Sequence, residues 1–123
     1  MPANAQATED GTNPQVARVI ARAREQAGLT STDIAEIMGI GTRQVQNWAA
    51  GKGRPADNKR LRQLLDLQYV LDLLAELFDA EGSLLWLHAR NRTLHGERPL
   101  DLLAAGRTDE VISLLDRLAD GNL

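Results

Sequence analysis

Residues 28–54 read GLTSTDIAEIMGIGTRQVQNWAAGKGR, and the spacing of their apolar and turn-forming residues predicts two short helices. Thr30 or Ser31 suits the start of the first helix and Thr42 the start of the second, because hydroxyl side chains accept hydrogen bonds from free amides at a helix N-terminus. Glycine adopts positive φ without strain, so the sequence GIG at residues 39–41 predicts a tight turn between them. Two helices joined by a short turn that contains glycine form a helix-turn-helix.

The second of these helices is expected at residues 43–50, with Val45 and Trp48 buried. Its opposite face then carries residue types that recognise base edges in the major groove, since arginine pairs with guanine and asparagine or glutamine with adenine. Basic residues beyond the helix suit phosphate contacts, which fix the register on the duplex. The candidate DNA-binding residues are Thr42, Arg43, Gln44, Gln46, Asn47, Lys52 and Arg54, with Lys59 and Arg60 as further phosphate contacts. The alternative is a capped polar helix in a small bundle that binds no DNA.

The net charge of the chain is −3, which is unusual for a protein that binds DNA, because a duplex is a dense line of negative charge. The charge is unevenly distributed. Residues 14–62 contain nine Arg or Lys and four acids, whereas residues 63–123 contain five Arg and eleven acids. A basic first half and an acidic second half indicate two partners of different kinds.

Composition excludes several function classes. The chain has 123 residues and no Cys, which excludes disulfides, thiol catalysis and Cys-based zinc sites and fits the reducing cytoplasm. Aromatic residues make up 3%, too few for recognition of single strands by base stacking. We find neither an apolar run of membrane-spanning length nor a signal-peptide pattern, and we expect no membrane partner. His88 and His95 have no carboxylates at ligand spacing, and no catalytic set can be assembled, so we expect no metal, no cofactor and no enzyme activity.

The rest of the chain is also predicted to be helical, so the expected fold is all-α. Residues 1–13 are small and polar and predict a disordered tail. Residues 14–56 are expected to form the helix-turn-helix domain, and residues 57–123 a helical domain that a long helix at residues 57–78 joins to it. The apolar residues of that long helix cover more than one stripe, so it is expected to pack on two sides.

Three shorter helices are expected after the long one. Asp79 or Ser83 is the candidate cap of the first, and Pro99 suits the first turn of the second. Thr108 is the candidate cap of the last helix. Residues 90–98, between the first two, are expected to form a loop.

A series of residues in the second half has a more specific pattern. The series is Trp86-Leu87, Arg90-Asn91, Leu94-His95-Gly96, Pro99-Leu100-Asp101-Leu102-Leu103, Gly106, Val111, Leu115 and Gly121. It resembles the C-terminal domain of the MbcA/ParS/Xre antitoxins. The helix-turn-helix before it is similar to the N-terminal, Xre/Cro-like part of that family. The resemblance spans about residues 14–121, most of the chain.

The resemblance implies a type II antitoxin that neutralises a RES-domain toxin, which destroys NAD, and that commonly represses its own promoter by binding operator DNA. It implies that the C-terminal domain contacts the toxin and that the C-terminal tail approaches the toxin's active site. Trp86 suits a core position as well as a contact. The candidate toxin-binding residues by position are Trp86, Arg90, Asn91, Leu94, Arg98, Arg117, Asp120, Gly121, Asn122 and Leu123.

Helix-turn-helix proteins usually bind two half-sites as dimers, so a homodimer is expected, with the Leu-rich long helix as a candidate seam. Two other functions fit the same residues. One is a stand-alone transcription regulator whose second half dimerises or senses a ligand. The other is a helical adaptor whose helix-turn-helix does not bind DNA.

Overall fold

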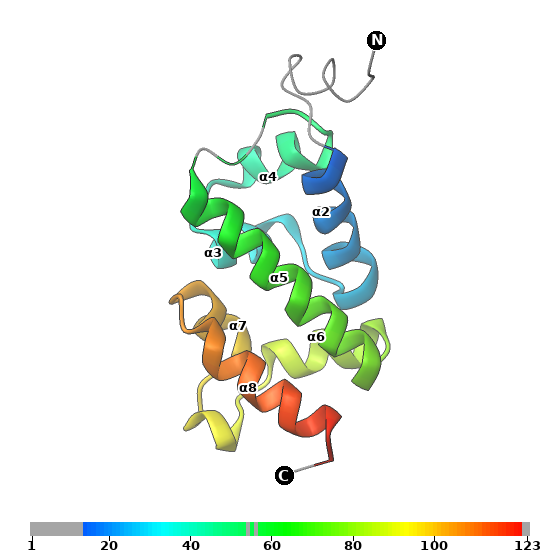
Figure 1. Cartoon of the computed structure of the whole chain (residues 1–123), viewed down its shortest axis with the longest axis vertical. Helices are drawn as coiled ribbons and strands as arrows, with labels where there is room; N and C mark the ends of the chain where they lie inside the picture. The colour runs from blue at the N-terminus through cyan, green and yellow to red at the C-terminus, as the bar shows by residue number, and fades with distance from the viewer. Residues whose placement is uncertain (1–13, 54, 56, 122–123) are drawn as a thin grey trace.

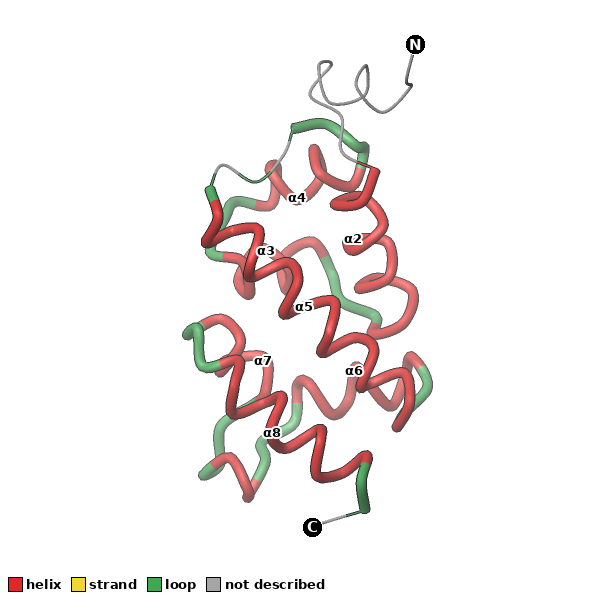
Figure 2. The backbone as a smooth tube through the Cα atoms, in the orientation of Figure 1, coloured by secondary structure: helices red, strands yellow, loops and turns green. Residues whose placement is uncertain are grey.

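The computed structural model describes residues 14–53, 55 and 57–121, which form seven α-helices and one 3-10 helix (Figure 1). The elements are α2 (Pro14–Ala27), α3 (Ser31–Met38), α4 (Thr42–Ala49), α5 (Asn58–Leu77), α6 (Ala80–His88), η1 (Arg92–Leu94), α7 (Pro99–Ala104) and α8 (Thr108–Ala119). The described residues contain no strand, only an isolated bridge between Asn91 and Glu97, so the predicted all-α fold is confirmed (Figure 2). The predicted tail at residues 1–13 lies outside the described residues.

Thr30, one of the two predicted candidates, is the N-cap of the first helix of the helix-turn-helix. The Thr30 hydroxyl accepts a hydrogen bond from the Asp33 amide at 3.1 Å, and the Asp33 carboxylate accepts one from the Thr30 amide at 3.1 Å. This reciprocal pair satisfies two amides that α3 leaves free at its start. At the other end, Gly39 has φ +67°, which lets the chain turn sharply toward α4.

The N-caps predicted for α4 and α8 are wrong, and for α6 the structure decides between the two candidates. Gly41 is the N-cap of α4 and Arg107 that of α8, so Thr42 and Thr108 are the first helical residues, and neither helix has a side-chain cap. Both helices begin one residue earlier than expected, and a hydroxyl in the first helical position no longer faces the free amides of the next turn. For α6 the cap is Asp79, whose carboxylate accepts a hydrogen bond from the Gly82 amide at 2.8 Å.

The long helix α5 crosses the middle of the molecule, with α2 on one side and α8 on the other (Figure 1). This confirms that it packs on two sides. The helix-turn-helix also touches the C-terminal half directly, since α2 packs on α6 and α3 on α7. The apolar side chains form one continuous core, whose fully buried members from both halves include Ile20, Ile34, Leu71, Leu74 and Leu115.

Part of the apolar surface of α5 does not enter this core. Leu61, Leu65 and Tyr69 are 47%, 57% and 45% exposed. They are spaced four residues apart, so they follow one another along a single face of the helix. We call these three residues the α5 ridge.

Candidate functional site

Helix α4 presents one face to solvent, as the sequence predicts. Val45 and Trp48 are buried, and the predicted reading residues on the other face are exposed: Thr42, Arg43, Gln46 and Asn47. Since the N-terminal part of such a helix enters the major groove, these side chains are placed to meet base edges.

The remaining predicted DNA-binding residues lie at the end of α4. Gln44 is half-buried, because its amide nitrogen folds toward Gly53, 3.6 Å from where a Cβ on that glycine would stand. Lys52 is exposed, and its backbone amide donates to the carbonyl of Asn47 at 2.8 Å, which holds it beside the helix end. Arg54 lies outside the described residues.

Several basic residues of the first half form bonds within the molecule. Arg22 pairs with Asp72 of α5, and Arg24 donates to the Ser31 hydroxyl at 2.8 Å. Arg60, predicted to contact phosphate, instead donates to backbone carbonyls at the end of α3. Of these three arginines only Arg22 is paired with an acid, whereas Arg24 and Arg60 keep their positive charge but have their guanidinium donors engaged within the molecule.

A side-chain contact joins α3 to the C-terminal half. The Asp33 carboxylate lies 3.3 Å from Nε2 of His88 on α6, whose Nδ1 lies 2.9 Å from the carbonyl of Leu84. Both ring nitrogens face acceptors, and both donate only when the imidazole is protonated. Burial raises the pKa of Asp33, but the hydrogen bonds from Thr30 and His88 outweigh it and hold that pKa below its ordinary value. Asp33 thus both completes the cap of α3 and makes a side-chain contact between the two halves.

Residues 90–98 form a loop with many internal hydrogen bonds. The Asn91 side chain accepts a bond from the Thr93 amide at 2.9 Å, and the Asn91 carbonyl accepts one from the Gly96 amide at 2.9 Å. Arg90 donates to the Gly96 carbonyl at 3.1 Å. Leu94 is 5% exposed and anchors the loop in the core. Of the predicted toxin contacts here, Leu94 is therefore inaccessible and Asn91 shapes the loop, whereas Arg90 remains exposed.

The other predicted toxin-binding residues lie on α6, α7 and α8. Trp86 is half-buried and stacks on Phe78, with ring centroids 6.2 Å apart. Arg98 forms two hydrogen bonds with Asp101, at 2.7 and 2.8 Å, which lower the pKa of that carboxyl. Arg117 lies in the last turn of α8 and lines a shallow cavity of about 330 Å³ together with Thr93 and His95, so the structure brings α8 and the loop together.

The end of α8 is acidic and exposed. Asp120 and Gly121 are exposed just beyond the last helical residue, and Asn122 and Leu123 lie outside the described residues. The Tyr69 hydroxyl donates to the Asp116 carboxylate at 3.2 Å. The charge of Asp116 raises the pKa of Tyr69, and Glu76 and Asp120 add to this effect. Three carboxylates, those of Asp116, Glu76 and Asp120, therefore lie close enough to Tyr69 to act on its hydroxyl.

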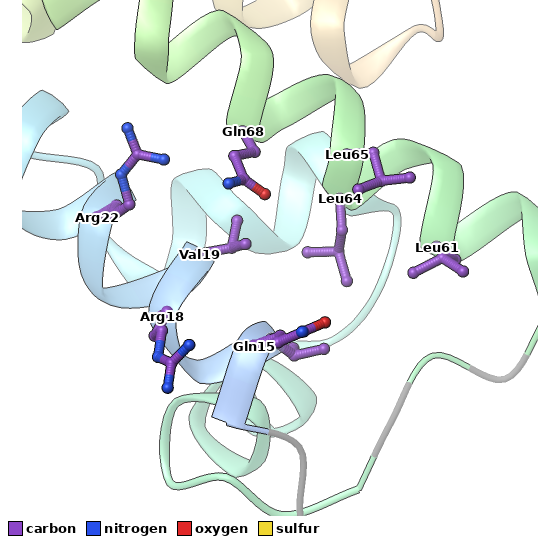
Figure 3. A pocket seen from close by; sticks show the side chains of 9 residues that line it. Gln15, Arg18, Val19, Arg22, Leu61, Leu64, Leu65 and Gln68 are labelled. Carbon is purple, nitrogen blue, oxygen red and sulfur yellow. The ribbon is translucent and has the colours of Figure 1, made fainter.

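A groove that the sequence did not predict lies between exposed edges of α2 and α5 (Figure 3). It encloses about 370 Å³, and two residues of the α5 ridge, Leu61 and Leu65, lie on its α5 side. Arg18 and Arg22 line it from α2. Its only indication in the sequence is the unusually broad apolar face of α5.

Neither a metal site nor a membrane span is found in the part of the chain that the structure describes. No group of three or more His, Cys, Asp or Glu side chains there is arranged to hold a metal ion. Among those same residues, no helix combines the length and the apolar character needed to cross a bilayer.

Comparison with known protein families gives a match for each half. Residues 73–121 match the antitoxin Xre/MbcA/ParS C-terminal toxin-binding domain, and residues 20–67 match a helix-turn-helix family. The first match begins and the second ends within α5, so this helix belongs to both halves.

Individual relatives are antitoxins. The chain is 43% identical over 94 residues to a probable mycobacterial cidal antitoxin of Mycobacterium tuberculosis, covering 76% of this chain and 79% of the relative. It is 33% identical over 106 residues to the mycobacterial cidal antitoxin MbcA of Mycobacterium bovis, covering 86% and 93% of the two chains. A chain in the crystal structure of the M. tuberculosis MbcT–MbcA toxin–antitoxin complex superposes with a TM-score of 0.74 at 33% identity, covering 87% of this chain and 96% of that one.

Proposed function

This chain belongs to the Xre/MbcA/ParS antitoxin family, and we propose that it binds and neutralises a RES-domain toxin that degrades NAD. The observation that carries the proposal is the match of residues 73–121 to a toxin-binding domain, on a fold that superposes on a chain of a toxin–antitoxin complex. The chain then acts by binding, without catalysis or a cofactor. The cytoplasm, where NAD and operator DNA are found, is its proposed location.

We propose that the acidic end of α8 blocks the toxin's NAD pocket. A site that binds NAD must accept a pyrophosphate and therefore tends to offer arginine and other donors. The carboxylates of Asp116 and Asp120 supply negative charge that such donors attract. The hydrogen-bonded loop at residues 90–98 lies beside α8, so its exposed Arg90 and the nearby Arg117 widen the contact surface.

Co-expression with the cognate RES toxin tests this function directly. The chain is expected to restore growth and the cellular NAD level and to co-purify with the toxin. Failure of both rescue and co-purification would refute the proposal.

We propose that the helix-turn-helix represses the antitoxin's own operon. In gel shifts with the operon's promoter, affinity is expected to fall steeply as salt rises, because phosphate contacts release counterions. Arg43→Ala is expected to cost about 1–3 kcal/mol of specific affinity and to remove preference at one base position. Glu25→Gln, an exposed change on α2, is the matched control and should bind as the wild type does. Absence of a shift at any salt concentration would favour an adaptor without DNA binding.

We propose that two copies associate through the α5 ridge. The ridge exposes two leucines and a tyrosine, and both leucines line the groove between α2 and α5, so in a dimer the ridge of each copy would pack against the ridge and groove of the other. Such a reciprocal contact is the usual form of a two-fold interface. Such a dimer would carry two α4 helices, as two half-sites require.

Leu65→Asp is expected to convert the homodimer to a monomer, because it places an unpaired charge in the apolar seam. Light scattering coupled to gel filtration gives the mass. Leu85→Asp provides the control, since Leu85 is 64% exposed on α6, outside the ridge, and this variant should remain dimeric. A monomeric wild type, or a dimeric Leu65→Asp, contradicts the proposed seam.

A further inference from the structure

Arg60 forms a polar link between α5 and the turn of the helix-turn-helix. Its Nη1 donates to the carbonyl of Met38 and, at 3.1 Å, to the side chain of Gln63. Its Nη2 donates to the carbonyl of Gly39 at 3.2 Å. Both backbone acceptors lie where α3 ends and the chain turns toward α4.

The contact suits the chemistry of a helix end. The last carbonyls of a helix have no partner within it and carry partial negative charge, which a cation stabilises. Arginine offers several donors in one plane, so it bonds two successive carbonyls at once. Gly39 fits the contact in two ways: its φ is +67°, and a Cβ there would lie 3.2 Å from Nη1 of Arg60.

We propose that Arg60 is a positioning residue for operator recognition, which fixes the direction of α4 relative to α5. This inference rests on the proposed DNA-binding function and the α5 seam. In a dimer joined through α5, the separation of the two α4 helices must match the spacing of the half-sites. Arg60 extends from the seam helix to the turn that precedes α4, so its bonds set that separation without touching DNA.

Salt dependence distinguishes positioning from phosphate contact. Each lost phosphate contact lowers the slope of log affinity against log salt by about 0.9. For Arg60→Met we expect that slope to be unchanged for nonspecific DNA, while the ratio of specific to nonspecific affinity falls about tenfold. Lys52→Met is the comparison, because Lys52 is exposed beside α4 and its loss should reduce the slope with the ratio nearly intact.

Two further measurements separate positioning from a general loss of stability. Amide hydrogen exchange in Arg60→Met is expected to rise at residues 39–42 and to stay at the wild-type rate in α8. Arg60→Lys, which keeps the charge without the planar fork, should restore only part of the specificity ratio. A reduced salt slope in Arg60→Met would overturn the inference, because it would mean that Arg60 contacts phosphate. The proposed repressor function would then still stand. A wild type that binds no operator would overturn both.

Discussion

Deletion of residues 120–123 is expected to abolish protection against the toxin while the fold remains intact. Asp120 and Gly121 are exposed and follow the last helical residue of α8, so their loss removes no side chain from the core. If this segment and its Asp120 carboxylate occupy the NAD pocket, their removal opens that pocket. We expect toxin affinity to fall about 100-fold, which corresponds to about 2.7 kcal/mol. Survival on toxin induction and the affinity of the purified pair measure the effect.

The thermal midpoint of the truncated protein supplies the control for folding and should stay within a few degrees of the wild-type value.

A second variant separates the effect of charge from the effect of chain length. Asp120→Asn keeps the full chain and is expected to give an intermediate loss, whereas Glu25→Gln on the opposite half should give none. Full protection by the truncated chain would show that the tail does not occlude the toxin.

Local sequence pattern predicts the helices well because their determinants lie within a few residues. The α3 cap needs only Thr30 and Asp33, three positions apart. The caps assigned to Thr42 and Thr108 fail because threonine is acceptable both before a helix and in its first turn, and the backbone angles of the preceding residue decide between them. Periodicity likewise identifies the exposed side of α4, since Val45 and Trp48 define its buried side.

The functional surfaces are less predictable because they depend on partners distant in sequence. Arg60 is positively charged and close to the recognition helix, which favours a phosphate contact. Its backbone acceptors, the carbonyls of Gly39 and Met38, lie 21 and 22 residues away. The α5 ridge presents the same difficulty, because a leucine at a core position and a leucine at an interface look alike in one sequence. Leu94 shows a different difficulty. It is one of the residues that carry the family resemblance, yet its side chain is buried. The residues shared with a family therefore include some that hold the loop in place as well as some that are exposed for contact.

Leu71→Ala is expected to destabilise both halves of the chain together. Leu71 is fully buried on α5, in the core that α2, α6, α7 and α8 share with it. Removing a buried leucine side chain costs about 2–5 kcal/mol, a large share of the 5–15 kcal/mol that is typical of a whole domain. Because the core continues from the helix-turn-helix into the C-terminal half, operator binding and toxin binding should weaken at the same denaturant concentration.

The two tryptophans report this cooperativity separately, since Trp48 lies in α4 and Trp86 in α6. Their indole N–H signals in NMR spectra, followed through a urea titration, are expected to disappear together in the wild type and together, at lower urea, in Leu71→Ala. Leu85→Ala removes the same atoms from a side chain that is 64% exposed, and its midpoint should shift by less than about 0.5 kcal/mol. Loss of the Trp48 signal well before that of Trp86 would mean that the head unfolds alone. In that case toxin binding would survive where operator binding is lost, and the shared core would not couple the two functions.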